Sequence, residues 1–299
     1  MIMKNYLCID IGGTYTKYAI LNENCQFIEK GKQPTEKESE ALFIEMLCDI
    51  AKKYEDVSGL AICSAGVIDS KRGIMHNGGS LSVIHDLDIV ARLEERLHKP
   101  VTIINDARSA LLAEVWQGAL EGCKSGVAVV IGTAVGGAII YDNILLEGAT
   151  NMAGELSYVI GENRRPMAEL GGVGYLIDEA SQLTGQKLTS GEEVFHLARE
   201  HNQDAIDAID HYAYQLALLI NNLYFIVNPE KIVIGGGISE EELFMEALQS
   251  ALKDVNMLYP FKVSMPIVEA CHYHNDANII GALYDHLTKQ DKIMTKRKR

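Results

Sequence analysis

The sequence is short of positive charge, and this shortage excludes several classes of partner. Its 299 residues include 27 Lys and Arg against 41 Asp and Glu, which gives a formal net charge of −14. Nucleic acids and anionic membrane surfaces attract basic proteins, so the sequence argues against a general binder of either. A small anionic ligand is not excluded, because local glycine loops can override the mean charge.

Long apolar runs and paired cysteines are also missing. The longest apolar run, around residues 127–141, is too short and too rich in glycine to span a bilayer. The first strand begins within the first ten residues, so we expect no signal peptide. The six cysteines form no Cys-x-x-Cys pair and mostly lie in apolar segments, which indicates reduced core thiols in a cytoplasmic protein. Cys271, His272 and His274 lie close together, but no further ligand is in view and a metal site is the weaker interpretation.

Glycine is present in tight turns, and the first of these lies near the start of the chain. Residues 6–11 form an apolar run with Asp10 near its end, Gly12 and Gly13 make a sharp turn, and residues 18–21 resume an extended pattern. The pattern predicts a hairpin whose loop exposes backbone N–H groups and suits a phosphate. No helix follows the glycines, so neither the P-loop nor the dinucleotide fingerprint fits. An ordinary hairpin with a glycine turn explains the loop equally well.

A second stretch, residues 126–143, repeats this design. An apolar strand runs into a Gly/Thr loop, another short strand and an Asp-Asn turn, and Ile11-Gly12 aligns with Ile131-Gly132. A repeat this long implies two similar domains rather than a solenoid.

The remaining patterns predict alternating strands and helices. We expect strands over 59–68, 100–104, 231–234 and 261–268, and helices over 41–54, 87–97, 107–116, 176–183, 192–200, 204–227 and from residue 276. Residues 30–40 are polar and indicate a solvated connection. Residues 74–82 are too polar for a core element and fit a ligand loop or a plain surface loop.

Two further positions have both a structural and a functional explanation. Asp106 follows a strand, where it either caps the next helix or faces a ligand crevice, and the two weigh about evenly. Gly235-Gly236-Gly237 forms either a tight turn or a place of nucleotide approach, with Ser239 as a plausible cap for the following helix.

Motifs in a fixed order carry a family resemblance. They are Asp10-Ile11-Gly12-Gly13-Thr14, Asn105-Asp106, Ile131-Gly132-Thr133 with Gly136-Gly137, and Ala153-Gly154-Glu155, supported by the turn at 235–237 and by residues 275–282. On these motifs the chain resembles, over nearly its full length, the ROK family of sugar kinases and repressors. The resemblance implies an α/β fold of two actin-like (ribonuclease H-like) domains flanking an ATP and sugar cleft. Their expected bounds are 1–115 with the helix 276–292, and 116–275.

The resemblance also implies roles for single residues. Asp106 would be the general base for the sugar hydroxyl that attacks the γ-phosphate of ATP, and Asp10 would help hold the magnesium of the nucleotide. The residues implied to line the nucleotide are Gly12, Gly13, Thr14, Lys17, Gly132, Thr133, Gly136, Gly236 and Gly237. The residues implied to contact the sugar are Gly78, Gly79, Asn105, Asp106, Glu155 and Tyr158.

Departures from the family pattern concern the sugar end of the site. Tyr158 stands where many members have a zinc-binding histidine, Tyr175 where they have a cysteine, Ile177 where they have a sugar-binding glutamate, and Ser80 where they have an asparagine. We therefore expect no structural zinc. Tyr158 and Ile177 would form an apolar, aromatic wall at the anomeric end, which suits a β-glucoside such as cellobiose. Among family members, β-glucoside kinase is the nearest likeness.

Other functions stay open at this point. A glucokinase or an N-acetylmannosamine kinase is the enzymatic alternative. A ROK repressor carries a winged helix-turn-helix ahead of these domains, for which the early first strand leaves no room. A non-catalytic sugar-binding regulator is disfavoured, because Asp10, Asp106 and both glycine loops occur together. The expected partners are a small sugar and, by resemblance, a second copy in a homodimer, with no nucleic acid or membrane.

Overall fold

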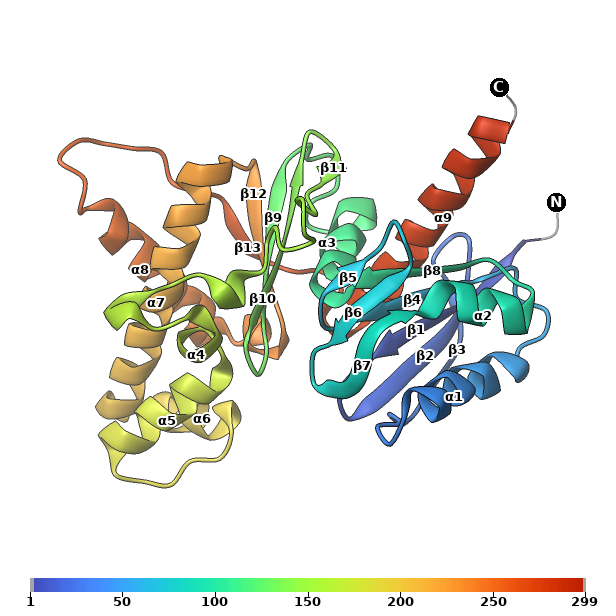
Figure 1. Cartoon of the computed structure of the whole chain (residues 1–299). Helices are drawn as coiled ribbons and strands as arrows, with labels where there is room; N and C mark the ends of the chain where they lie inside the picture. Colours follow the sequence, from blue (N-terminus) through green and yellow to red (C-terminus); the bar gives the residue numbers. More distant parts are fainter. Residues whose placement is uncertain (1–2, 298–299) are drawn as a thin grey trace. The chain divides into compact units, whose positions relative to one another are not determined.

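The computed structural model describes the backbone of residues 3–297 and the side chains of residues 3–274 and 276–291. The chain packs into two compact units (Figure 1). The first contains the residues up to Gln117, the segment Gly148–Met152 and the residues from Asp276 onward, and the second contains Gly118–Glu147 and Ala153–Asn275. Within the described part of the chain, no helix is long and apolar enough to cross a membrane.

The first unit is built on a mixed sheet. Its strands lie in the order β3 (Phe27–Pro34), β2 (Tyr15–Asn22), β1 (Asn5–Ile11), β4 (Leu60–Ser64) and β8 (Val101–Asn105). The antiparallel pairing of β1 with β2 confirms the predicted first hairpin, and β1, β4 and β8 are parallel.

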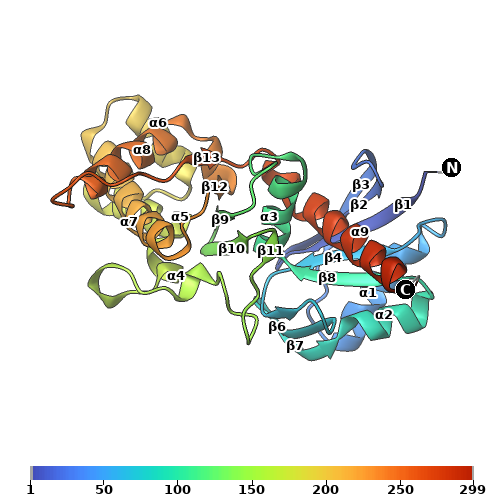
Figure 2. The same ribbon diagram turned by 90° about the horizontal axis from the view of Figure 1, so that it is seen from above.

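Helices cover both faces of this sheet, as Figures 1 and 2 show. On one face lie α1 (Glu40–Lys52) and α2 (Ile89–Leu97), and on the other α3 (Asp106–Gln117) packs against α9 (Ala277–Arg297). Alternate residues of β1 face the two layers: Leu7 and Ile9 join the apolar core under α1, whereas Asp10 is turned toward α9 and bonds to Asn278.

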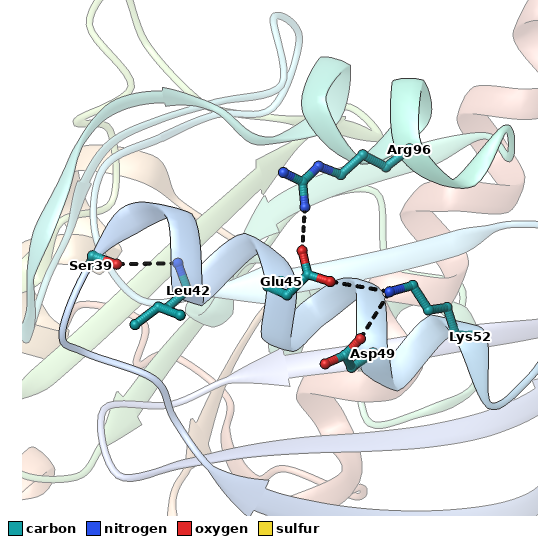
Figure 3. A network of polar contacts seen from close by, with 6 residues as sticks. All are labelled: Ser39, Leu42, Glu45, Asp49, Lys52 and Arg96. Carbon is teal, nitrogen blue, oxygen red and sulfur yellow. Dashed lines mark hydrogen bonds and ion pairs between the residues drawn. The ribbon is translucent and has the colours of Figure 1, made fainter.

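Helix α1 confirms the prediction made from the spacing of its apolar residues, and a cap and surface ion pairs support it further. Ser39 caps it by accepting a hydrogen bond from the Leu42 N–H at 3.2 Å. On its exposed side Glu45 accepts hydrogen bonds from Lys52 at 3.1 Å and from Arg96 of α2 at 2.7 Å (Figure 3). Its apolar residues meanwhile line the core of the first unit.

Two polar segments of the first unit are strands, against expectation. Residues 30–34, predicted as part of a solvated connection, belong to β3, an edge strand whose side chains are mostly exposed. A strand with little buried surface lacks the apolar signal on which the prediction rests.

Residues 74–82 belong to a small antiparallel sheet of β5 (Ile68–Asp69), β6 (Ile74–Gly78) and β7 (Leu81–Asp88). Met75 and Leu81 are buried between polar neighbours, so alternation rather than mean polarity was the relevant signal. Only the turn at Gly79 and Ser80 fits the predicted loop.

The second unit repeats the sheet of the first. Its strands lie in the order β11 (Ile144–Leu145), β10 (Val135–Tyr141), β9 (Gly126–Ile131), β12 (Lys231–Gly235) and β13 (Val268–Ala270). The antiparallel pairing of β9 with β10 confirms the second predicted hairpin, and β9, β12 and β13 are parallel.

The helices of the second unit enclose its largest apolar core against this sheet. They are α4 (Met167–Leu170), α5 (Val173–Thr184), α6 (Gly191–Arg199), α7 (Gln203–Val227) and α8 (Glu242–Asn256). Short 3₁₀ turns lie at Leu156–Tyr158, Glu162–Arg164, Gly237–Glu240 and His274–Asp276.

Two predictions for the second unit are wrong in detail. The strand expected over 261–268 lies instead at Val268–Ala270, because pairing with β12 begins only at Ile232 opposite Val268. Ser239 does not cap α8: it is buried, its Oγ donates to the Gly236 carbonyl at 2.8 Å, and α8 begins after Glu241. Ser239 therefore stabilises the 3₁₀ turn at Gly237–Glu240 rather than the start of α8.

Candidate active site

Asp10 and Asp106 lie at one edge of the first sheet. Asp10 is at the carboxyl end of β1 and Asp106 directly follows β8, with β4 between the two strands. Carboxyl ends of parallel strands share an edge, which is where open α/β sheets bind ligands. Burial raises the pKa of both carboxyl groups, and the charge of Asp10 raises the pKa of Asp106 further. The structure thus brings together the two acids that the sequence singled out.

Asp10 is held by neighbours that the local pattern did not reveal. Its Oδ1 accepts from the Asn278 Nδ2 at 3.3 Å and from the Cys63 thiol at 3.6 Å. Lys17 stands opposite on β2, and its charge acts to lower the pKa of Asp10. Asn278 comes from the first turn of α9, so only the packing of distant segments identifies it.

Asn105, not Asp106, makes the capping bond of α3. The Asn105 Oδ1 accepts from the Arg108 N–H at 3.2 Å, and its Nδ2 donates to the Gly66 carbonyl at 3.1 Å. Asp106 accepts from the adjacent Ala107 N–H, at 2.8 Å. The structural explanation for Asp106 therefore loses its main support, since the cap is already supplied.

The loop at Gly12–Thr14 is braced from outside the hairpin. The Gly12 N–H donates to the Tyr15 carbonyl at 3.1 Å, while Thr35 donates its hydroxyl to the Gly12 carbonyl at 2.7 Å and its N–H to the Thr14 carbonyl at 3.0 Å. A Cβ on Gly13 would lie 2.2 Å from the Ser80 Oγ, so this loop meets the turn between β6 and β7. No pattern in the sequence pointed to Thr35.

The turn at Gly78 and Gly79 is ordered by Asn77. Its Oδ1 accepts from the Val67 N–H at 3.2 Å and from the Gly79 N–H at 3.1 Å. Gly79 is exposed with φ of +61°, a conformation that glycine adopts without strain. Asn77 and Gly79 lie close to Gly66, whose carbonyl accepts the hydrogen bond from Asn105. The turn therefore lies near Asn105.

The glycine turns of the second unit meet at the carboxyl ends of β9 and β12. Gly132 and Thr133 are exposed, and the Gly132 carbonyl accepts from the Val173 N–H of α5 at 3.0 Å. Gly236 has φ of +91°, and a Cβ there would lie 1.8 Å from the Ile131 carbonyl oxygen. Only glycine fits so close an approach, and Gly237 beyond it is exposed.

The segment with Glu155 and Tyr158 lies against β10. A Cβ on Gly137 would meet Leu156 at 2.4 Å, and the Ser157 Oγ donates to the Val135 carbonyl at 2.7 Å. Glu155 and the strand residue Gly136 are half-buried, whereas Tyr158 is 68% exposed. Ile177 of α5 is half-buried and packs against the core of this unit.

Arg108 is a buried residue that the sequence reading passed over. Its side chain is 1% exposed, and its Nη2 donates to the Asn151 carbonyl at 2.7 Å. Within the described part of the structure, its Nε and Nη1 have no hydrogen-bond partner. The bound segment, Gly148–Met152, leads directly into the motif that begins at Ala153. An arginine near the start of a helix that is mostly apolar from Ala110 onward could have pointed to this buried side chain.

Comparison with known proteins gives the same assignment as the motifs. A β-glucoside kinase of Listeria innocua is 29% identical, with 95% of this chain and 97% of that protein covered, and a glucokinase of Halalkalibacterium halodurans is 29% identical over 92% and 93%. The crystal structure of a ROK family protein from Streptococcus pneumoniae TIGR4 in complex with sucrose superposes with a TM-score of 0.87, at 27% identity over 96% of this chain and 99% of that one. The fold is therefore the α/β, actin-like ATPase fold of the ROK sugar kinases. The family model described as "ROK family" matches residues 6–289, and the chain belongs to the ROK family.

Proposed function

We propose that this chain is an ATP-dependent sugar kinase that phosphorylates the 6-hydroxyl of a β-glucoside such as cellobiose. The observation that carries the kinase assignment is the pair of acids at the carboxyl ends of β1 and β8, on one edge of the same sheet and beside a braced glycine turn. Phosphoryl transfer requires positioned substrates, charge neutralisation and one well-placed base rather than covalent catalysis. The first unit supplies the base and an anion-binding turn on rigid elements.

Asp106 is assigned as the general base. Burial and the neighbouring charge of Asp10 raise its pKa, which strengthens the carboxylate as a proton acceptor. Because Asn105 caps the helix, the Asp106 carboxylate remains available for a sugar hydroxyl. Asn105 and Glu155 are assigned to hydrogen bonds with other hydroxyls of the sugar, together with the turn at Gly78 and Gly79.

The nucleotide is assigned to the glycine turns of the two units. The residues are Gly12, Gly13, Thr14 and Lys17 in the first unit, and Gly132, Thr133, Gly136, Gly236 and Gly237 in the second. Glycine turns at strand ends suit phosphate oxygens, and Thr14, Thr133 and Gly237 of this set are exposed. Asp10 fits a nucleotide-bound Mg²⁺, which proteins typically hold through one or two carboxylates. Magnesium would supply neutralisation of charge on the phosphates.

The β-glucoside specificity is assigned to Tyr158 and Ile177. Tyr158 exposes its ring at the end of the Glu155 segment, and Ile177 offers an apolar side chain in place of a carboxylate. An aromatic surface of this kind favours a substituted anomeric carbon over a free hydroxyl. A relative named β-glucoside kinase supports this choice. A neighbour holding sucrose, an α-glucoside, supports only a site for a sugar whose anomeric carbon carries a substituent.

The deciding experiment is a coupled ADP-release assay with MgATP. Glucose, cellobiose, an aryl β-glucoside and N-acetylmannosamine are compared by kcat/KM, with Asp106→Asn as the blank. Higher kcat/KM for the two β-glucosides is expected. Preference for glucose or N-acetylmannosamine would retain the kinase and refute the specificity, and no sugar-dependent ADP release would refute the kinase.

Glucokinase activity is the second candidate, because a relative of equal identity carries that name. The double variant Tyr158→His with Ile177→Glu tests it. If the two residues select the β-glucoside, the variant loses preference for cellobiose relative to glucose. An unchanged ratio would show that specificity lies elsewhere.

A further inference from the structure

A glutamine is buried in the apolar interior of the second unit. Gln215 lies in the middle of α7 and is 2% exposed. A buried amide is unfavourable unless its donors and acceptor are paired. Its Nε2 donates to the Glu162 Oε2 at 2.6 Å and lies 3.1 Å from the Nε2 of His211.

The histidine continues the network to α5. His211 precedes Gln215 by one helical turn, and its Nδ1 is hydrogen-bonded to Glu179. A carboxylate can only accept, so the amide nitrogen of Gln215 must face Glu162. The same amide nitrogen lies within hydrogen-bond distance of His211 Nε2, and the other ring nitrogen, Nδ1, is bonded to Glu179. These contacts form the Gln215 network, defined as Glu162, Glu179, His211 and Gln215, which joins α5, α7 and the 3₁₀ turn at Glu162–Arg164.

Glu162 belongs to a segment that closes on itself. The Met167 N–H donates to the Val159 carbonyl and the Gly161 N–H to the Arg165 carbonyl, each at 2.8 Å. These bonds make residues 159–167 a compact loop. Glu162 lies at its tip, so the bond to Gln215 ties the whole loop to α7.

A second contact reaches the same loop through an aromatic ring. The Tyr175 ring lies edge-on to the His211 ring, with centroids 6.3 Å apart, and the Arg165 guanidinium lies 5.3 Å from the centre of the Tyr175 ring. A cation over an aromatic face is attracted by the ring. The loop is therefore held on two sides by α5 and α7.

The residues proposed to bind sugar precede this loop directly. Ser157 anchors the start of the segment on β10, and Glu162 anchors it on α7. Tyr158 lies between the two anchors. Its orientation therefore depends on both, since its own exposed ring makes few contacts.

We propose that Gln215, His211 and Glu179 are positioning residues for sugar recognition. They hold Glu162 in place and through it fix the segment that carries Glu155 and Tyr158. The assignment of that segment to the sugar rests on the proposed function. Sugar affinity then depends on the Gln215 network. ATP affinity does not depend on it, because the glycine turns are held by other contacts.

The test compares the binding of cellobiose and of ATP to the same variants by titration calorimetry. Gln215→Leu removes the buried amide at similar size, and Glu162→Ala removes the acceptor at the loop surface, where folding is not at risk. Each variant should bind cellobiose about 10-fold more weakly, as expected for a lost hydrogen bond to a charged group, with ATP affinity within about twofold. Glu162→Gln keeps an acceptor oxygen for Gln215 and should restore cellobiose affinity.

The control is Glu200→Gln, which breaks an exposed pair with His196 in the same unit. Equal weakening of both ligands, or no change in either, would overturn the positioning role. The outcome is independent of catalysis, because binding is measured directly. If the wild-type protein binds cellobiose but releases no ADP, the proposed kinase activity is refuted. The positioning role of the Gln215 network is then still tested by the cellobiose affinities of its variants.

Discussion

The two hairpins place different chemistry on the same scaffold. Both units order their strands with a hairpin followed by two parallel strands, and both hairpins end in a glycine turn. At the constant offset of the repeat, Val130 occupies the position of Asp10, and Gly132 that of Gly12. The first unit thus has an acid beside its turn and the second has none.

The comparison suggests a division of labour between equivalent turns. A turn with an adjacent carboxylate can serve both a phosphate and its metal ion, whereas a turn without one can serve only the anion. The braces differ as well: Thr35, beyond an edge strand, supports the first turn, and Val173 at the start of a helix supports the second. Equivalent backbones therefore do not imply equivalent roles.

The largest effect on turnover should come from Asp106, which lies outside both hairpins. Asp106→Asn keeps the size of the side chain and removes the base, so turnover should fall at least about 10²-fold. The coupled ADP-release assay measures it, and circular dichroism checks the fold. A loss below tenfold would contradict the assignment of Asp106 as base.

A smaller but selective effect is expected at the position where the hairpins differ. Asp10→Asn should lower turnover by roughly 10-fold or more and raise the Mg²⁺ concentration needed for half-maximal rate, because a carboxylate ligand is lost. The matched change in the second hairpin is Val130→Thr, which should leave the Mg²⁺ dependence within about twofold. Equal Mg²⁺ dependence of the two variants would remove the proposed asymmetry.

The glycines of the two turns offer a matched pair. A Cβ on Gly12 would lie 2.9 Å from the Tyr15 carbonyl oxygen, whereas at Gly132 the nearest atom is 4.0 Å away. Gly12→Ala should therefore destabilise the fold by about 1–3 kcal/mol, and Gly132→Ala should leave it unchanged. Thermal unfolding compares them. A rise in the KM for ATP in Gly132→Ala without loss of stability would support nucleotide binding at the second turn.

The pH dependence of stability should also differ between the units. In the first, His286 is fully buried, its Nδ1 lies 2.9 Å from the Thr102 Oγ1, and burial lowers its pKa to about 4. The unfolded chain then binds more protons, so stability is complete above about pH 6.5 and is lost as the pH falls toward 4. Between pH 7.5 and 5.0 the loss should be about 2 kcal/mol.

Urea unfolding of wild type and His286→Gln at both pH values measures this loss. The variant should show a smaller decrease, since glutamine does not titrate. Identical decreases in the two proteins would exclude His286 as the source. Among the buried residues of the described chain, the second unit has no corresponding histidine.

The smallest effect is expected on the exposed side of α1. Lys52 and then Arg96 hold the pKa of Glu45 below its usual value through hydrogen bonds (Figure 3). Because these groups are in water, Glu45→Gln should lower the melting temperature only slightly, and the difference should vanish at high salt. Activity should stay within about twofold of wild type. A large, salt-independent loss would show that this surface matters more than its exposure implies.

Features with a local signal could be predicted from the sequence. Both hairpins combine apolar strands with glycine turns, and α7 ends at Asn228 before Pro229 as expected. β3 was missed because its side chains are mostly exposed, and pairing rather than composition defines it.

The acids of the candidate site were likewise visible in the sequence, whereas their supports were not. Asn278 and Thr35 reach Asp10 and Gly12 only through the folded chain. Gln215 could have been selected, since a polar residue on the buried side of an apolar helix requires a partner.

The first unit is assembled from segments that are far apart in the chain, and this has a consequence for its biosynthesis. α9, which packs on α3 and on the face of the sheet that carries Asp10, is the last helix in chain order, while the second unit is complete before it begins. A ribosome therefore synthesises all of the second unit before it makes α9, the helix that completes the first. Vectorial folding would leave the acids without Asn278 and the rest of α9 until α9 itself has been translated, so premature termination within α9 would leave this edge of the sheet exposed to chaperones and proteases.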